Sequence, residues 1–294
     1  MARARSNGIE LEYDVAGNPA DPALLLVMGL GAQMIAWDDE FVLGLARRGH
    51  FVVRFDNRDV GLSTHLDGAP APTAAEVLAR RSAGQPLGVA YTLRDMADDA
   101  AGLLDHLELP AAHVVGASMG GMVAQSLAIA HPKRVRSLVS IMSTTGAPGL
   151  PPAKPEAMAR LGLPAPADRA GYVEHSLATQ RLFHGSGFPF DEERGRRNAG
   201  RFWDRAFYPQ GIARQITAIM ASGSRREALA ELDVPALVIH GLEDPLVPVE
   251  GGLDTHQAIA GSELLLIDGM GHALPRGTWP ALVDAIQKLV ARAS

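Results

Sequence analysis

The feature that most constrains the fold of this chain is a set of short, mostly apolar segments that recur between longer helical stretches. A strand that is covered on both faces of a sheet has such a continuous apolar sequence. Strands that alternate with helices are typical of parallel βα units. Segment 9–15 instead alternates apolar and polar residues, which predicts a half-buried edge strand. The predicted buried strands are 23–28, 51–55, 113–115, 138–141, 236–239 and 263–267.

One long interval, residues 146–229, interrupts this alternation. It exceeds what a crossover between strands requires, and it opens with a proline-rich linker. We therefore expect a helical cap over 146–229, inserted in a core formed by 1–145 and 230–294. The interval also holds more than half of the aromatic residues of the chain. Phe183, Trp203 and Phe207 are candidates for an apolar substrate pocket, although such residues can equally form the cap's own core.

A second local pattern predicts a catalytic residue. Strand 113–115 leads into Gly116-Ala117-Ser118-Met119-Gly120, a Gly-x-Ser-x-Gly sequence followed directly by a helix-like segment. A strand that turns sharply into a helix brings neighbouring backbone close to the serine, so glycines are needed around it. This nucleophile elbow predicts Ser118 as a nucleophile. It also places Met119 N–H at a helix N-terminus, where it can donate to a developing oxyanion.

A nucleophilic serine needs a histidine as base and a carboxylate behind that histidine. Glu243 and Asp244 follow strand 236–239, and His272 follows strand 263–267 in a glycine-rich loop. Loops that follow parallel strands emerge at one edge of the sheet, so these groups can converge on Ser118. The adjacent Asp268 is a further acid near the histidine loop, so spacing alone leaves the identity of the acid open.

The turn Met28-Gly29-Leu30-Gly31 follows strand 23–28, and we expect Leu30 N–H to be the second oxyanion donor. Glycines after a buried strand also occur in dinucleotide-binding dehydrogenases. The third glycine of that fingerprint is missing here, because position 34 is Met34, so the dehydrogenase alternative is weaker.

Two other groups of polar residues are interpreted as structural. Asp56, Arg58 and Asp59 are expected to form a buried ion-pair scaffold beneath the oxyanion turn. His240, at the end of a predicted strand, is expected to be a packed, hydrogen-bonded histidine rather than a base. The remaining histidines lack metal-ligand spacing, so no metal site is expected.

These motifs together resemble the α/β-hydrolase fold family over essentially the whole chain. The sequences of 27–33, 55–63 and 269–273 are similar to bacterial carboxylesterases of the aclacinomycin methylesterase type. The resemblance implies a mostly parallel central sheet flanked by helices, with a helical cap. It implies Ser118, Asp244 and His272 as catalytic triad, Leu30 and Met119 amides as oxyanion hole, and no cofactor. Many relatives have His-Gly where this chain has Met28-Gly29, so the geometry of the hole can differ.

Composition excludes several other classes of protein. The net charge of −6 and the pI near 5.9 argue against a nucleic-acid partner. The basic residues of 1–7 are followed by no apolar run, and no segment is long enough to span a bilayer. The absence of cysteine permits a cytoplasmic location, which is the expectation. The expected partner is a small-molecule ester, and the oligomeric state is not predicted.

The resulting functional hypothesis is a serine carboxylic-ester hydrolase that forms an acyl-enzyme on a small to medium apolar ester. The same triad also supports a lactonase, a cofactor-free perhydrolase, carbon–carbon bond hydrolysis or proline-specific peptide cleavage, since these differ in cap and pocket. A ligand-binding sensor of the same fold, without turnover, is an alternative from another class.

Overall fold

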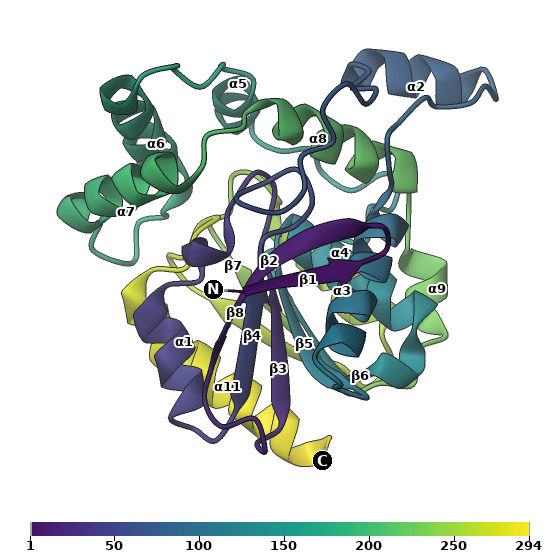
Figure 1. Ribbon diagram of the computed structural model, residues 1–294, viewed down its shortest axis with the longest axis vertical. Helices are drawn as coiled ribbons and strands as arrows, with labels where there is room; N and C mark the ends of the chain where they lie inside the picture. The colour runs from purple at the N-terminus through teal and green to yellow at the C-terminus, as the bar shows by residue number, and fades with distance from the viewer. Residues whose placement is uncertain (1, 294) are drawn as a thin grey trace.

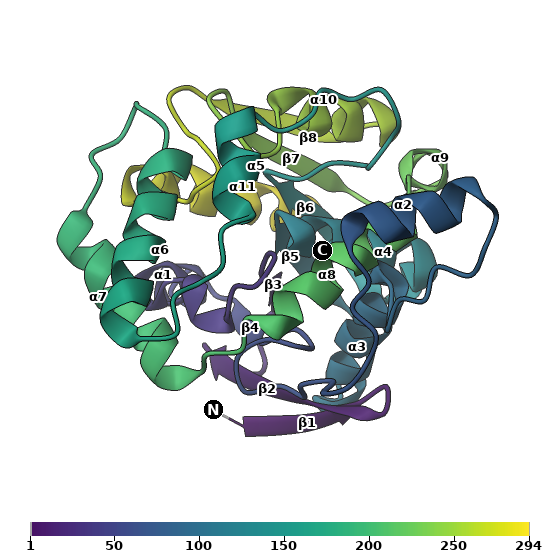
Figure 2. The same ribbon diagram turned by 90° about the horizontal axis from the view of Figure 1, so that it is seen from above.

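The computed structural model describes residues 2–293, in which an eight-stranded sheet lies between two layers of helices (Figures 1 and 2). The strand order is β1-β2-β4-β3-β5-β6-β7-β8. The first two pairings are antiparallel and all others are parallel, as the alternation of strands and helices predicts. The strands are β1 (Ala2–Ser6), β2 (Ile9–Ala16), β3 (Ala23–Val27), β4 (Phe51–Phe55), β5 (Ala112–Ala117), β6 (Val135–Ile141), β7 (Ala236–Gly241) and β8 (Glu263–Ile267).

The prediction that residues 9–15 form an edge strand is wrong, because β1 lies outside β2 at this edge of the sheet. The two strands form a hairpin around Asn7 and Gly8, which have φ of 47° and 79°. Asn-Gly is favoured in such two-residue turns, because both central positions require positive φ. Arg3 pairs across the hairpin with Glu10 and Glu12, each at 3.3 Å. The basic segment therefore complements the acidic residues of β2.

The two faces of the sheet support two separate apolar cores. Side chains of α3 (Leu93–His106) and α4 (Met119–Ala130) pack against the sheet in one core. Those of α1 (Asp39–Ala46) and α11 (Trp279–Arg292) pack against it in the other. The central strands β3, β4, β5 and β7 are buried along their whole length, as their continuous apolar sequences predict. Helix α10 (Val249–Ala258) contacts β7 and β8. Short 3₁₀ helices occupy Met34–Ala36, Pro132–Arg134 and Arg276–Thr278.

The segment between β6 and β7 forms five helices, of which α5 to α8 stand above the sheet in Figure 1. It contains α5 (Pro155–Leu161), α6 (Arg169–Phe183), α7 (Glu192–Arg205), α8 (Gln210–Ser222) and α9 (Arg226–Ala230). Helix α9 contacts α4 and α10, so it packs on the core although the expected cap range reaches residue 229. Helix α2 (Ala74–Ser82) precedes β5 in the sequence and contacts helix α8 of the cap. Arg81 of α2 donates a hydrogen bond to Ala221 O at 2.9 Å.

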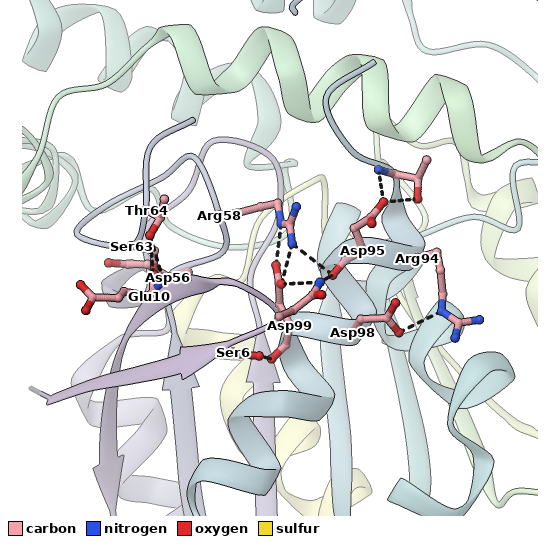
Figure 3. Close-up of polar contacts among 12 residues, drawn as sticks. Ser6, Glu10, Asp56, Arg58, Ser63, Thr64, Arg94, Asp95, Asp98 and Asp99 are labelled. Carbon is pink, nitrogen blue, oxygen red and sulfur yellow. Dashed lines mark hydrogen bonds and ion pairs between the residues drawn. The ribbon is translucent and has the colours of Figure 1, made fainter. Parts of the chain in front are cut away.

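The expected ion-pair scaffold is confirmed. Asp56, Arg58 and Asp59 are almost fully buried. Arg58 donates to both carboxylate oxygens of Asp99 in α3, and Figure 3 shows this pair above the helix. Buried charges of this kind require close partners, since each isolated ion would lose its hydration without compensation.

The two aspartates of this scaffold pair with arginines of the cap. Asp56 lies 2.7 Å from Arg205 of α7, and Asp59 lies 2.8 Å from Arg214 of α8. The scaffold therefore joins the cap to the core. None of the helices within residues 2–293 combines the length and the apolar character needed to cross a membrane.

Candidate active site

Ser118 lies at the sharp turn between β5 and α4, in a strained backbone conformation with φ of 57° and ψ of −122°. Its amide donates to Ile141 O at 2.9 Å, and Ser143 Oγ donates to its carbonyl oxygen at 2.8 Å. A Cβ at Gly116 would lie 2.1 Å from Gly120 O. Close backbone packing thus holds Ser118 in this conformation, although its backbone strain costs roughly 1–3 kcal/mol of stability.

The structure brings Ser118, His272 and Asp244 together in one hydrogen-bonded chain. His272 Nε2 lies 2.9 Å from Ser118 Oγ, and His272 Nδ1 lies 2.7 Å from Asp244 Oδ2. A carboxylate accepts the Nδ1 proton, which leaves Nε2 free to accept the serine proton. Both ring nitrogens of His272 are occupied by these two contacts, although Ser118 and His272 are 154 residues apart.

The environment of Asp244 favours its ionised form. Its Oδ1 accepts hydrogen bonds from Leu246 and Val247 N–H, both at 2.8 Å. Burial raises the pKa of Asp244, but the charge of His272, hydrogen bonds from His240 and His272, and the Val247 amide outweigh burial and bring the pKa to about 2. Asp244 therefore carries a full negative charge at neutral pH.

The structure distinguishes Asp244 from the neighbouring Glu243. The Glu243 side chain is directed to the cap, where its carboxylate accepts hydrogen bonds from Ser186 N–H and Oγ, each at 2.7 Å. These contacts hold the pKa of Glu243 below its usual range. His240 is fully buried and its Nε2 lies 2.8 Å from Val247 O and 3.5 Å from Asp244 Oδ2, so it is packed and hydrogen-bonded as expected.

The turn after β3 passes directly beside the serine. A Cβ added to Gly29 would lie 3.1 Å from Ser118 Cβ. Leu30 follows Gly29 in this turn, and Met119 is the first residue of α4. Asn57 holds the turn from below by donating to Met28 O at 2.9 Å. Both amides predicted to form the oxyanion hole thus belong to segments adjacent to Ser118.

The same turn contacts a residue that no sequence signal indicates. The amide of Gly31 donates to Gln215 Oε1 of α8 at 2.8 Å. The two residues are 184 positions apart, and no local motif links them. Only the fold could reveal this contact.

A cavity of about 520 Å³ reaches the histidine side of this site. Phe183 and His272 both line it, and their rings meet edge to face with centroids 5.9 Å apart. Six aromatic side chains contribute to the lining: Trp37, Phe41, Phe183, Phe188, Phe190 and Trp279. Arg194 also lines the cavity and lies over the Trp279 ring.

Trp203 and Phe207, the other candidates for a substrate pocket, lie elsewhere in the cap. Their rings pack on each other with centroids 4.2 Å apart, and both contact Tyr172 of α6. This cluster is distinct from the lining of the cavity beside His272. Their assignment to a substrate pocket stays a prediction; both side chains are half-buried and pack on each other and on Tyr172.

Backbone atoms of the cap also contact the histidine loop directly. Gly187 N–H donates to Gly269 O at 2.9 Å, and Gly271 N–H donates to His184 O at 3.1 Å. A Cβ at Gly185 would lie 2.4 Å from Gly269 O. We call this contact of 184–187 with 269–271 the glycine seam. Within the described part of the chain, no cluster of three or more His, Asp or Glu residues is arranged to hold a metal ion.

Comparison with known proteins agrees with this architecture. Residues 22–275 match the family model described as alpha/beta hydrolase fold. The chain is 32% identical over 297 residues to rhodomycin D methylesterase DauP of Streptomyces sp. strain C5, covering 92% of this chain and 91% of the relative. The crystal structure of the esterase RhEst1 from Rhodococcus sp. ECU1013 superposes with a TM-score of 0.78 at 20% identity, covering 100% and 99% of the two chains.

A second solved structure shares the fold to the same degree. The meta-cleavage product hydrolase of Pseudomonas fluorescens IP01 gives a TM-score of 0.78 at 17% identity, covering 100% of this chain and 98% of the other. Fold, strand order and the match over residues 22–275 lead to one assignment. The chain belongs to the α/β-hydrolase family.

Proposed function

We propose that this protein is a serine carboxylic-ester hydrolase with Ser118, His272 and Asp244 as its catalytic triad. The observation that carries the proposal is the continuous chain of hydrogen bonds from Ser118 Oγ through His272 to Asp244, at 2.9 and 2.7 Å. Its similarity over nine-tenths of the chain to a methylesterase supports an ester as substrate.

In the proposed reaction, His272 Nε2 takes the hydroxyl proton as Ser118 Oγ attacks the ester carbonyl carbon. The developing oxyanion accepts hydrogen bonds from the Leu30 and Met119 amides. His272 then protonates the leaving alcohol, and the acyl group remains on Ser118. A water molecule, deprotonated by His272, attacks this acyl-enzyme and releases the acid. Asp244 keeps His272 in the required tautomer and stabilises its charged form.

The lining of the cavity indicates the kind of ester. Phe183 and His272 place an aromatic wall at the reacting groups, and the other rings extend it. Burial of an aromatic group against such rings is favourable, at roughly 25 cal/mol for each Å² of apolar surface removed from water. We therefore propose an apolar, aromatic-bearing ester as substrate, with a methyl ester as the first to test because of the methylesterase relative.

The test compares hydrolysis of p-nitrophenyl esters of graded acyl length and of methyl esters of aromatic acids. Ser118→Ala should abolish turnover and labelling by a serine-reactive phosphonate. Ser126→Ala, which removes a half-buried hydroxyl of the same helix α4, should leave both unchanged. Full turnover by Ser118→Ala would refute the proposed nucleophile. Labelling of Ser118 without turnover of any ester would refute the proposed substrate class and direct the assay to lactones.

A further inference from the structure

The Leu30 turn is held in place by the cap as well as by the core. Gln215 in α8 is fully buried, and both ends of its side-chain amide are used. Its Oε1 accepts the Gly31 N–H at 2.8 Å, and its Nε2 donates to Arg58 O at 2.9 Å. Gln215 thus joins the turn after β3 to the loop after β4.

Helix packing alone does not explain a glutamine at this position. Burying an amide group costs free energy unless its hydrogen bonds are made, and an aliphatic residue would fill the space without that requirement. Gly31 has φ of 65°, and a Cβ there would lie 2.8 Å from Ile212 of the same helix α8. The backbone at Gly31 is therefore fixed by a hydrogen bond and by close packing, both supplied by the cap.

Two further contacts tie the next residues of this loop to the cap. Gln33 Nε2 donates to Phe202 O and Ala206 O at 2.8 and 2.9 Å. Met34 N–H donates to Asp56 Oδ1 at 2.7 Å, and Asp56 pairs with Arg205 of α7. Residues 31, 33 and 34 are thus each held by hydrogen bonds, whereas Gly29 lies against Ser118.

We propose that Gln215 is a positioning residue that fixes the orientation of the Leu30 amide through its hydrogen bond to Gly31. The cap then forms a structural part of the oxyanion hole. This inference rests on the proposed function, because it assigns the Leu30 amide to the stabilisation of an oxyanion. An oxyanion exists only in the transition state and intermediate, so a displaced donor should lower kcat and leave KM almost unchanged.

The decisive variant is Gln215→Met, which retains the length of the side chain and removes both hydrogen bonds. We expect kcat to fall about 10- to 100-fold, somewhat less than for complete loss of an oxyanion donor. Binding of an aryl boronic acid, which mimics the tetrahedral intermediate, should weaken by a similar factor. The affinity for the product acid should stay within about threefold, since it has no tetrahedral oxyanion.

A second variant separates the two hydrogen bonds. Gln215→Glu keeps an acceptor for Gly31 N–H and removes the donor to Arg58 O, so it should retain much more kcat than Gln215→Met. Gln210→Met, at an exposed position of the same helix, is the matched control and should behave as the wild type. A Gln215→Glu variant with a native melting curve and a kcat as low as that of Gln215→Met would overturn the proposal.

Hydrogen exchange measured by mass spectrometry gives a readout that does not depend on turnover. Peptides covering 29–34 should exchange faster in Gln215→Met and not in Gln210→Met. Unchanged exchange, or an unchanged kcat, in Gln215→Met refutes the positioning role. Equal losses of affinity for boronic acid and product acid also refute it, since they indicate general damage. Failure of the wild type to hydrolyse any ester would instead refute the proposed function, and the exchange measurement would still test the anchor.

Discussion

Replacement of Asp244 by Asn tests how the proposed catalytic triad depends on the position of a single proton. Oδ1 of Asp244 accepts two amide protons, and Oδ2 faces His272 Nδ1. An asparagine can match the two backbone donors only if its oxygen takes the place of Oδ1. Its NH₂ group then donates to His272 Nδ1, which forces the imidazole proton onto Nε2. In that tautomer Nε2 cannot accept the proton of Ser118.

The size of the effect follows from the alternative orientation. If the amide flips to accept from His272, its NH₂ group faces two backbone N–H donors, and two hydrogen bonds are lost. Each such loss in a buried site costs about 1–3 kcal/mol, so restoring the active tautomer costs about 2–6 kcal/mol. Loss of the charge that stabilises the imidazolium adds to this. We therefore expect kcat/KM to fall about 10³- to 10⁴-fold.

The assay is ester hydrolysis by Asp244→Asn, with Glu243→Gln as the control for loss of a neighbouring carboxylate. Glu243 contacts Ser186, so its replacement should leave kcat/KM close to that of the wild type. Activity of Asp244→Asn within tenfold of the wild type would refute the reasoning.

The lowered pKa of Asp244 also affects the stability of the fold. The shift from 3.8 to about 2 contributes about 2 kcal/mol to the free energy of unfolding at pH 7, and this contribution is lost as the pH falls from about 4 to about 2.

Two further predictions concern stability. Ser118→Gly should be more stable than Ser118→Ala by about 1 kcal/mol in guanidinium unfolding, because glycine adopts positive φ without strain; equal values would argue against strain at the elbow. Burial lowers the pKa of His113 to about 4, so between about pH 6.5 and 4 the unfolded state binds a proton that the native state does not. As the pH is lowered over that range, the free energy of unfolding should fall by up to about 3 kcal/mol. His113→Asn should flatten this dependence on pH. An unchanged slope in His113→Asn would exclude His113 as its source.

Much of the architecture could be predicted because its signals are local. Continuous apolar strands and the glycines around Ser118 each report on a few neighbouring residues, and parallel strands then force the loops after them to one edge. The hairpin of β1 and β2 is not predicted although Asn7-Gly8 is a local turn signal, because the arginines on either side of Ala4 indicate only a basic segment.

The features that could not be predicted depend on contacts between distant residues. Gln215 accepts a hydrogen bond from Gly31, 184 positions away in the sequence, and neither local sequence predicts this contact. Phe183 and Trp203 are similar as sequence signals, yet one ring meets His272 and the other packs on Phe207. Hydrophobicity predicts that such a residue is covered, but it does not say by which neighbour.

The glycine seam limits how a cap of this kind can be exchanged between relatives. Backbone from 184–187 lies directly on backbone from 269–271, so the four glycines of the seam have no room for a Cβ: Gly185, Gly187, Gly269 and Gly271. A chimaera that receives a foreign cap should therefore keep the histidine loop in place only if both halves of the seam come from one parent. Recombination breakpoints that separate the two halves should give fewer folded, active enzymes than breakpoints within α6 or α7.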